Sequence, residues 1–115
     1  MAKNRIRERC QQRSFVVPEG TESGDPVVIG QIPGVALEDR GEMIEDQATV
    51  QMDGEFELPV TGKNKAGEKA IAEGDIIFLK GGELNVNSEE GVRFGYALAP
   101  VVKNKTEVIP VKVGY

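Results

Sequence analysis

Short runs of apolar residues, separated by Gly, Pro, Asp and Asn, recur along the chain from about residue 14 to its end. In GEFELPV at residues 54–60, apolar and acidic residues alternate, as the period of two in a half-buried strand requires. Nine strands are predicted, at residues 14–17, 27–31, 35–38, 48–52, 55–60, 76–80, 83–87, 92–98 and 107–113. We therefore expect an all-β fold of eight to nine short strands, either a small barrel or a sandwich of β-tulip or jelly-roll type.

One segment, KAGEKAIAEG, has helical character. Residues 66–72 would form about two turns, with Ala70 and Ile71 covering one end of a barrel before Gly74 stops the helix. The prediction is therefore at most one short helix.

A pattern in SGDPVVIGQIPGVAL, at residues 23–37, returns in weaker form as EGDIIFLK and RFGYALAP. Each copy has a Gly-Asp turn into an apolar strand, then a second strand that begins at a glycine able to lie close to another backbone. The shared residues are Gly24, Asp25 and Gly34 in the first copy and Gly74, Asp75 and Gly95 in the second. The second copy is longer, with a tight hairpin expected at Gly81-Gly82. The pattern indicates a pseudo-symmetric β-fold, with coincidence in a glycine-rich chain as the alternative.

The length of 115 residues predicts one domain with a modest core. No apolar run approaches the roughly 20 residues of a membrane span, and we expect no membrane association. The first residues lack the apolar stretch of a secretory signal, so we expect no export by that route. A single cysteine, Cys10, is consistent with synthesis in a reducing cytoplasm.

The net charge of −5 is unevenly distributed. Residues 1–13 hold five basic residues and one acidic residue, whereas residues 14–115 hold nine basic and eighteen acidic ones. We interpret residues 1–13 as an extended basic arm and residues 14–115 as a single β-domain. The arm either orders on an acidic partner or is only a solvated tail. Its candidate binding residues are Lys3, Arg5, Ile6, Arg7, Arg9 and Arg13.

Catalytic chemistry finds little support in the sequence. The chain has no histidine, which removes the commonest general base and metal ligand. TGKNK at residues 61–65 lacks the upstream glycine and the following Ser or Thr of a phosphate loop. The acidic pairs at residues 38–39 and 45–46 lack calcium-loop spacing. We therefore expect neither an enzyme nor a bound metal or cofactor.

Several motifs, in order, carry a resemblance that covers nearly the whole chain: MAKNRI, SGDPVVIG with PGVAL, DGEFELPV, EGDIIFL and FGYAL. Together they resemble the small capsid cement or head decoration proteins of tailed phages, a family long catalogued as uncharacterised and sometimes labelled recombinase-like. The arm, with RIRERCQQR, has denser arginines than the usual opening of the family.

The resemblance implies a structural protein of the virion, made in the host cytoplasm, that binds the outer surface of an assembled phage head. It would stabilise the head by bridging subunits of the major capsid protein, as a homo-oligomer, a trimer or alternatively a dimer. Arg5, Arg7 and Arg9 share one strand parity, so they could meet a row of carboxylates together. The alternatives are a host-binding adhesin on the head and, disfavoured by the acidic body, a nucleic-acid-binding module that uses the arm.

Overall fold

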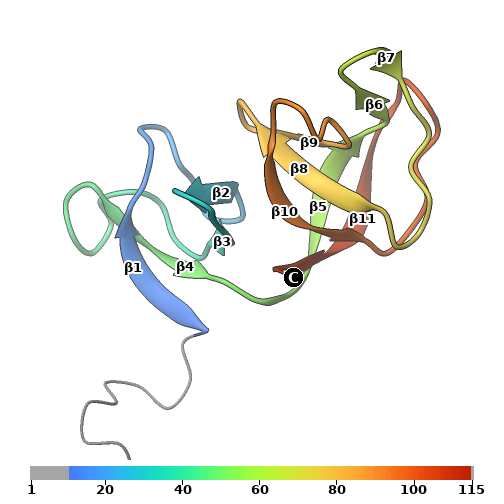
Figure 1. The fold of residues 1–115 in the computed structure, drawn as a ribbon. Coiled ribbons are helices and arrows are strands. Elements are labelled where there is room, and N and C mark those ends of the chain that lie inside the picture. Colours follow the sequence, from blue (N-terminus) through green and yellow to red (C-terminus); the bar gives the residue numbers. More distant parts are fainter. Residues whose placement is uncertain (1–10, 115) are drawn as a thin grey trace, which may run out of the picture.

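The structure, a computed structural model, describes residues 11–114 and is built from strands (Figure 1). No helix occurs in that part of the chain. Its strands are β1 (Gln12–Val16), β2 (Pro26–Ile29), β3 (Ile32–Ala36), β4 (Gln47–Gln51), β5 (Gly54–Thr61), β6 (Lys63–Asn64), β7 (Gly67–Glu68), β8 (Ile76–Lys80), β9 (Glu83–Asn85), β10 (Val92–Ala97) and β11 (Thr106–Val113).

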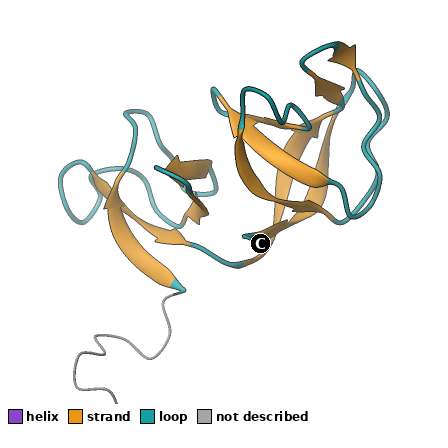
Figure 2. Cartoon of the chain, in the orientation of Figure 1, coloured by secondary structure: helices purple, strands orange, loops and turns teal. Residues whose placement is uncertain are grey.

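The strands form two main bodies that lie side by side (Figure 2). The first is a curled antiparallel sheet in the order β1-β4-β3-β2. The second is a closed barrel in the order β10-β11-β5-β9-β8, in which β9 lies parallel to β5. Strands β6 and β7 form a small hairpin at one end of the barrel. The short stretch between β4 and β5 joins the two bodies.

The barrel interior holds most of the buried apolar side chains. Alternate residues of its strands point inward, and Val60, Ile77, Phe94 and Val111 are fully buried there, as the two-residue period of a strand requires. Val35 of β3 belongs to the same cluster. The curled sheet therefore packs its outer face against the barrel.

A second, smaller core lies on the concave face of the curled sheet. It consists of Val17, Val27, Ala48 and Val50, with Phe15 packed at its margin. This cluster is small because one side of the sheet remains open.

The all-β prediction is confirmed, and the barrel alternative is confirmed for the second body. All nine expected strands overlap observed ones, and the short strands β6 and β7 were not expected. The predicted Gly81-Gly82 hairpin is present, since Lys80 pairs with Glu83 across it.

The helix predicted at residues 66–72 is wrong. This stretch contains β7 and an isolated bridge between Ile71 and Val101, each of which donates its N–H to the other's carbonyl oxygen at 2.9 Å. The Ile71 side chain is buried among the barrel residues. Pairing with a distant segment of the chain therefore overrides a weak local helical preference.

The expected boundary of the arm also shifts. Strand β1 begins at Gln12, and Arg13 pairs with Val50 of β4, so Arg13 belongs to the sheet. Lys3, Arg5, Ile6, Arg7 and Arg9 lie outside the described residues. The assignment of residues 14–115 to one domain stays a prediction.

We expect Phe94→Ala to lower the free energy of unfolding by about 3–5 kcal/mol, because the ring is fully buried in the barrel and its loss leaves a cavity. Val108→Ala is the control, since Val108 is 65 % exposed on β11, and its effect should stay within about 0.5 kcal/mol. Chemical denaturation measures both values. Equal effects would contradict the assignment of the core.

Candidate functional site in an open half-barrel

The two Gly-Asp turns of the repeat have the same backbone hydrogen bonds. The Gly24 N–H donates to the carbonyl oxygen of Ala36 at 2.7 Å, and the Gly74 N–H donates to that of Ala97 at 2.7 Å. Both glycines have a φ of +92°, a conformation that other residues rarely adopt. The repeated sequence thus produces a repeated turn.

The aspartates of the two turns also act alike. The Asp25 carboxylate accepts a hydrogen bond from the Glu22 N–H at 2.9 Å, and the Asp75 carboxylate accepts one from the Ala72 N–H at 2.8 Å. Each side chain closes its own turn, as aspartate commonly does. These aspartates are structural elements of the fold.

Gly34 and Gly95 lie directly beneath a neighbouring strand. An added Cβ would stand 2.8 Å from the carbonyl oxygen of Gln51 at Gly34 and would collide with the carbonyl oxygen of Lys112 at Gly95. Gln51 and Lys112 hold matching positions, since they pair with the residues that follow the two glycines. The second glycine of each copy is therefore required by close backbone approach.

The equivalence extends far beyond the short motifs. The order β1-β4-β3-β2 of the curled sheet matches the order β5-β11-β10-β8 within the barrel, with the same strand directions. The matched segments are 12–17 with 55–60, 21–30 with 71–80, and 34–52 with 95–113. The molecule is thus built from two copies of one four-stranded unit, which we call the first and second halves.

Besides the small β6-β7 hairpin, the halves differ in one added strand. Gly34 follows Gly24 by 10 positions, whereas Gly95 follows Gly74 by 21. The additional residues form β9, which pairs with β8 on one side and β5 on the other. Its Leu84 lies inside the barrel. Strand β9 therefore closes the second half.

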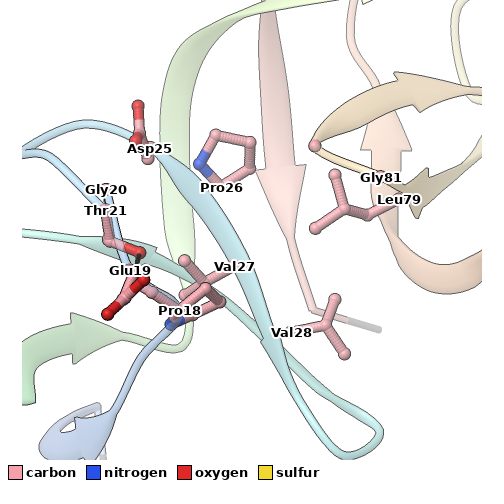
Figure 3. Close-up of a pocket in the computed structure, with 11 residues that line it drawn as sticks. Pro18, Glu19, Gly20, Thr21, Asp25, Pro26, Val27, Val28, Leu79 and Gly81 are labelled. Carbon is pink, nitrogen blue, oxygen red and sulfur yellow. Dashed lines mark hydrogen bonds between the residues drawn. The ribbon is translucent and has the colours of Figure 1, made fainter. Parts of the chain in front are cut away.

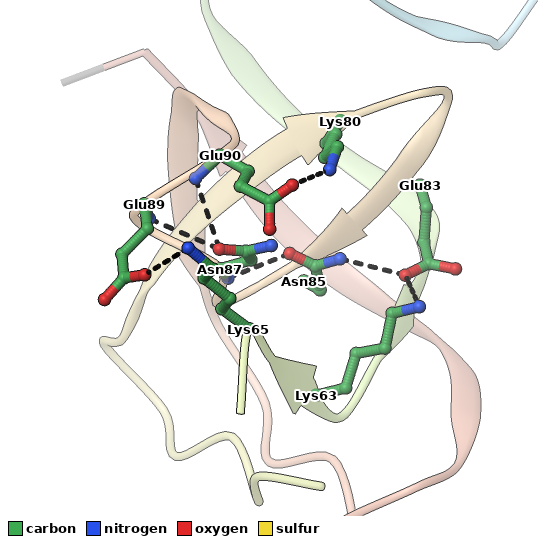
Figure 4. Close-up of polar contacts among 8 residues, drawn as sticks. All are labelled: Lys63, Lys65, Lys80, Glu83, Asn85, Asn87, Glu89 and Glu90. Atoms are coloured by element: carbon green, nitrogen blue, oxygen red, sulfur yellow. Dashed lines mark hydrogen bonds and ion pairs between the residues drawn. The ribbon is translucent and has the colours of Figure 1, made fainter. Parts of the chain in front are cut away.

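Polar contacts anchor β9 to the segment that follows β5 (Figure 4). The Glu83 carboxylate pairs with Lys63 at 2.9 Å and accepts a hydrogen bond from Asn85 at 2.9 Å. Burial raises the pKa of Glu83, but the hydrogen bonds from Lys63 and Asn85 and the Lys63 charge outweigh it, so the pKa lies below its usual value. Glu83 therefore stays ionised at neutral pH.

Two further ion pairs, Lys65 with Glu89 and Lys80 with Glu90, hold the loop that follows β9. The hydrogen bond from Lys80 is the largest contribution that lowers the pKa of Glu90. Exposed pairs of this kind contribute little stability one by one. In the second half, they orient the added strand and its loop.

The first half has no counterpart of β9 within residues 11–114, so β1 and β2 are edge strands. Gly30 and Gln31 form a two-residue turn, and Ile29 and Ile32 are the pair that closes it. Hydrogen-bonded and non-bonded pairs alternate along such a ladder, which leaves the N–H and C=O of Val28 directed away from β3. This edge of β2 can accept another strand.

A groove of about 550 Å³ lies along this edge (Figure 3). Residues 18–21, which follow β1, line one side, and residues 25–28 line another, mostly along β2. Leu79 and the Gly81-Gly82 turn of the second half complete the lining. Glu19 is its exposed acidic side chain beside β1.

Other chemistry is sparse in the described part of the chain. Residues 11–114 contain no cluster of three or more carboxylates or thiols able to hold a metal ion. Within the same residues, no helix is long and apolar enough to cross a membrane. The Arg13 guanidinium carbon lies 5.8 Å from the centroid of the Phe15 ring, a local contact within β1.

Sequence reasoning found the two Gly-Asp turns but missed the open edge between β1 and β2. It predicted the strand at residues 83–87 but not that this strand closes one half of the fold. The constant spacing of 61 residues between 34–52 and 95–113 is a signal that could have revealed the full duplication. The added strand is then the main difference between the halves.

A family model described as phage cement protein matches residues 11–113 of the chain. The match includes nearly all the described residues and both halves of the fold. No curated protein and no solved structure matches the chain.

We expect Gly34→Ala and Gly95→Ala each to destabilise the protein by about 1–3 kcal/mol, because the added methyl group collides with backbone that the sheet holds in place. Glu57→Ala, on the exposed side of β5, is the control and should change little. Thermal and chemical unfolding measure the differences. Unchanged stability of both glycine variants would rule out close approach as the reason for these residues.

Proposed function

Because the chain belongs to the phage cement protein family, we propose that it binds the outer surface of an assembled phage head and bridges neighbouring subunits of the major capsid protein. The family description indicates a structural phage role and association with a capsid. The finer points, namely the outer surface, the bridging and a homo-oligomeric form, are our proposals. The observation that carries them is the match over residues 11–113.

The proposed role requires binding rather than catalysis. A small protein that contacts two capsid subunits raises the cost of separating them, and many copies on one head multiply a modest contact. The β-fold supplies a rigid body for this purpose. Its acidic surface disfavours nucleic acid, whose phosphates would repel it.

One exposed apolar site is a candidate for contact with the capsid. Met43 and Ile44 lie in the loop between β3 and β4 and are 79 % and 51 % exposed. At the matching positions of the second half stand the polar residues Asn104 and Lys105. Two adjacent apolar side chains at a loop tip would bury apolar surface against a partner. The two halves thus have different surfaces on a shared frame.

The basic arm would add to the attachment. Its residues Lys3, Arg5, Ile6, Arg7 and Arg9 are proposed to order on the assembled head, where charge attraction and strand pairing can offset the loss of chain entropy. Arg13 is a member of β1 and is not part of this segment.

The direct test uses purified, undecorated heads of the phage that encodes the protein. We expect the protein to bind to saturation at a fixed ratio to the capsid protein and to delay DNA release on heating. Sedimentation measures the occupancy, and dye accessibility of the DNA measures release. Binding to host cells or glycans without binding to heads would instead indicate an adhesin. A salt-sensitive shift of free DNA would indicate a nucleic-acid-binding module.

We expect the double variant Met43→Asn with Ile44→Lys to weaken head binding at least tenfold, because it gives the loop the residues of its counterpart in the second half. Its melting temperature should match that of the parent protein, since both side chains are exposed. The matched control is Val108→Asn, another exposed apolar position. Undiminished occupancy of the double variant at limiting concentration would exclude this loop from the contact.

A further inference from the structure

We propose that residues 5–7 in the N-terminal arm of a second copy close the first half, lying between β1 and β2 as β9 lies between β5 and β8. The inference rests on the proposed function, because copies would meet on the surface of the head. It identifies a second copy as the partner of the basic arm. The receptor is the free edge of β2, which the groove adjoins at Val28.

The second half supplies the template for this interaction. There β9 runs antiparallel to β8, with Leu84 opposite Leu79, and parallel to β5, with Leu84 beside Val60. The counterparts of Leu79 and Val60 in the first half are Ile29 and Val17. A strand that enters the first half in the same direction would pair with the unbonded N–H and C=O of β2, a common mode of peptide recognition.

The arm has the residue pattern that this position requires. In β9, buried Leu84 stands between two polar residues, Glu83 and Asn85. In the arm, Ile6 stands between two arginines. With Ile6 in the position of Leu84, its side chain would enter the small core of the first half, and both arginines would point to the opposite face of the strand.

The charges are complementary, with signs reversed between the halves. In the second half, Glu83 of the inserted strand pairs with Lys63, three positions after Val60. In the first half, Glu19 lies two positions after Val17 and lines the groove. An arm with Ile6 in the place of Leu84 puts Arg5 in the place of Glu83. An Arg5–Glu19 pair would then replace the Glu83–Lys63 pair.

The arm of the same chain cannot reach this position. If Ile6 lies beside Val17, then Arg7 lies level with Pro18. Pro18 is six residues from Gln12, the start of β1, which is about 20 Å along the strand. The chain from Arg7 back to Gln12 spans at most about 18 Å and would also have to reverse direction. Parallel neighbours need a longer connection of a dozen or more residues. The arm of a second copy can reach the position if β1 of that copy begins within about 18 Å of the groove, the maximum span of the segment between Arg7 and Gln12.

Disulfide trapping tests the predicted register in the full-length protein with Cys10→Ser. Ile6→Cys combined with Ile29→Cys should give covalently linked copies under mild oxidation, both in concentrated solution and on decorated heads. Arg7→Cys with Val28→Cys tests the same register at the neighbouring pair, on the opposite face of the strand. Ile6→Cys with Val108→Cys is the control, because Val108 lies on the second half, away from the groove.

A charge exchange tests the pairing by a second route. Glu19→Lys or Arg5→Glu alone should reduce the yield of linked copies at least fivefold, and the two together should restore it, since they recreate the arrangement of Glu83 and Lys63. Loss without restoration would overturn the proposed pairing.

The results separate this inference from the proposed function. In one outcome, the protein decorates heads fully, but the two trapping pairs give no more linked copies than the control. This outcome would overturn the inference and leave the cement role intact. Linked copies in solution with no binding to heads would support the inference and contradict the cement role. If the arm instead orders on carboxylates of the capsid, heads would be decorated without linked copies, and the inference would be overturned.

Discussion

The pairing of backbone groups at the edges of a curled four-stranded sheet is the constraint on which this structure depends. A sheet with free edges exposes unpaired N–H and C=O groups, and proteins cover, pair or close them. The second half resolves this constraint by closure, since β9 joins β8 to β5 and places Leu84 in the core. The first half has the same four strands and leaves β1 and β2 unpaired within residues 11–114.

In the proposed role, the duplication lets the two halves of one small chain serve two purposes. The closed half supplies most of the core, and the curled sheet packs against it through Val35. The open half is then free to differ at its surface, where it has an unpaired edge and the exposed apolar pair Met43 and Ile44. A structural role on a capsid requires both features, a stable frame and surfaces that bind neighbours.

The alternation of apolar residues predicted the strands well, because burial on one face of a sheet leaves a local signature that the sequence preserves. The helix expected near Ala70 failed because the pairing of Ile71 with Val101 is a long-range contact with no local signature. The turns at Gly24 and Gly74 were visible for the opposite reason, since a left-handed backbone requires glycine locally. The groove was not visible in the sequence, because it arises from a strand that the second half has and the first half lacks.

A reconstruction of decorated heads by electron cryomicroscopy, at a resolution that separates strands, tests the account most directly. We predict that the protein sits on the outer surface across a junction between capsid subunits, and that an extra strand from a neighbouring copy lies between β1 and β2. A protein bound within a single capsid subunit, with that edge empty, would contradict both the bridging role and the closure of the first half.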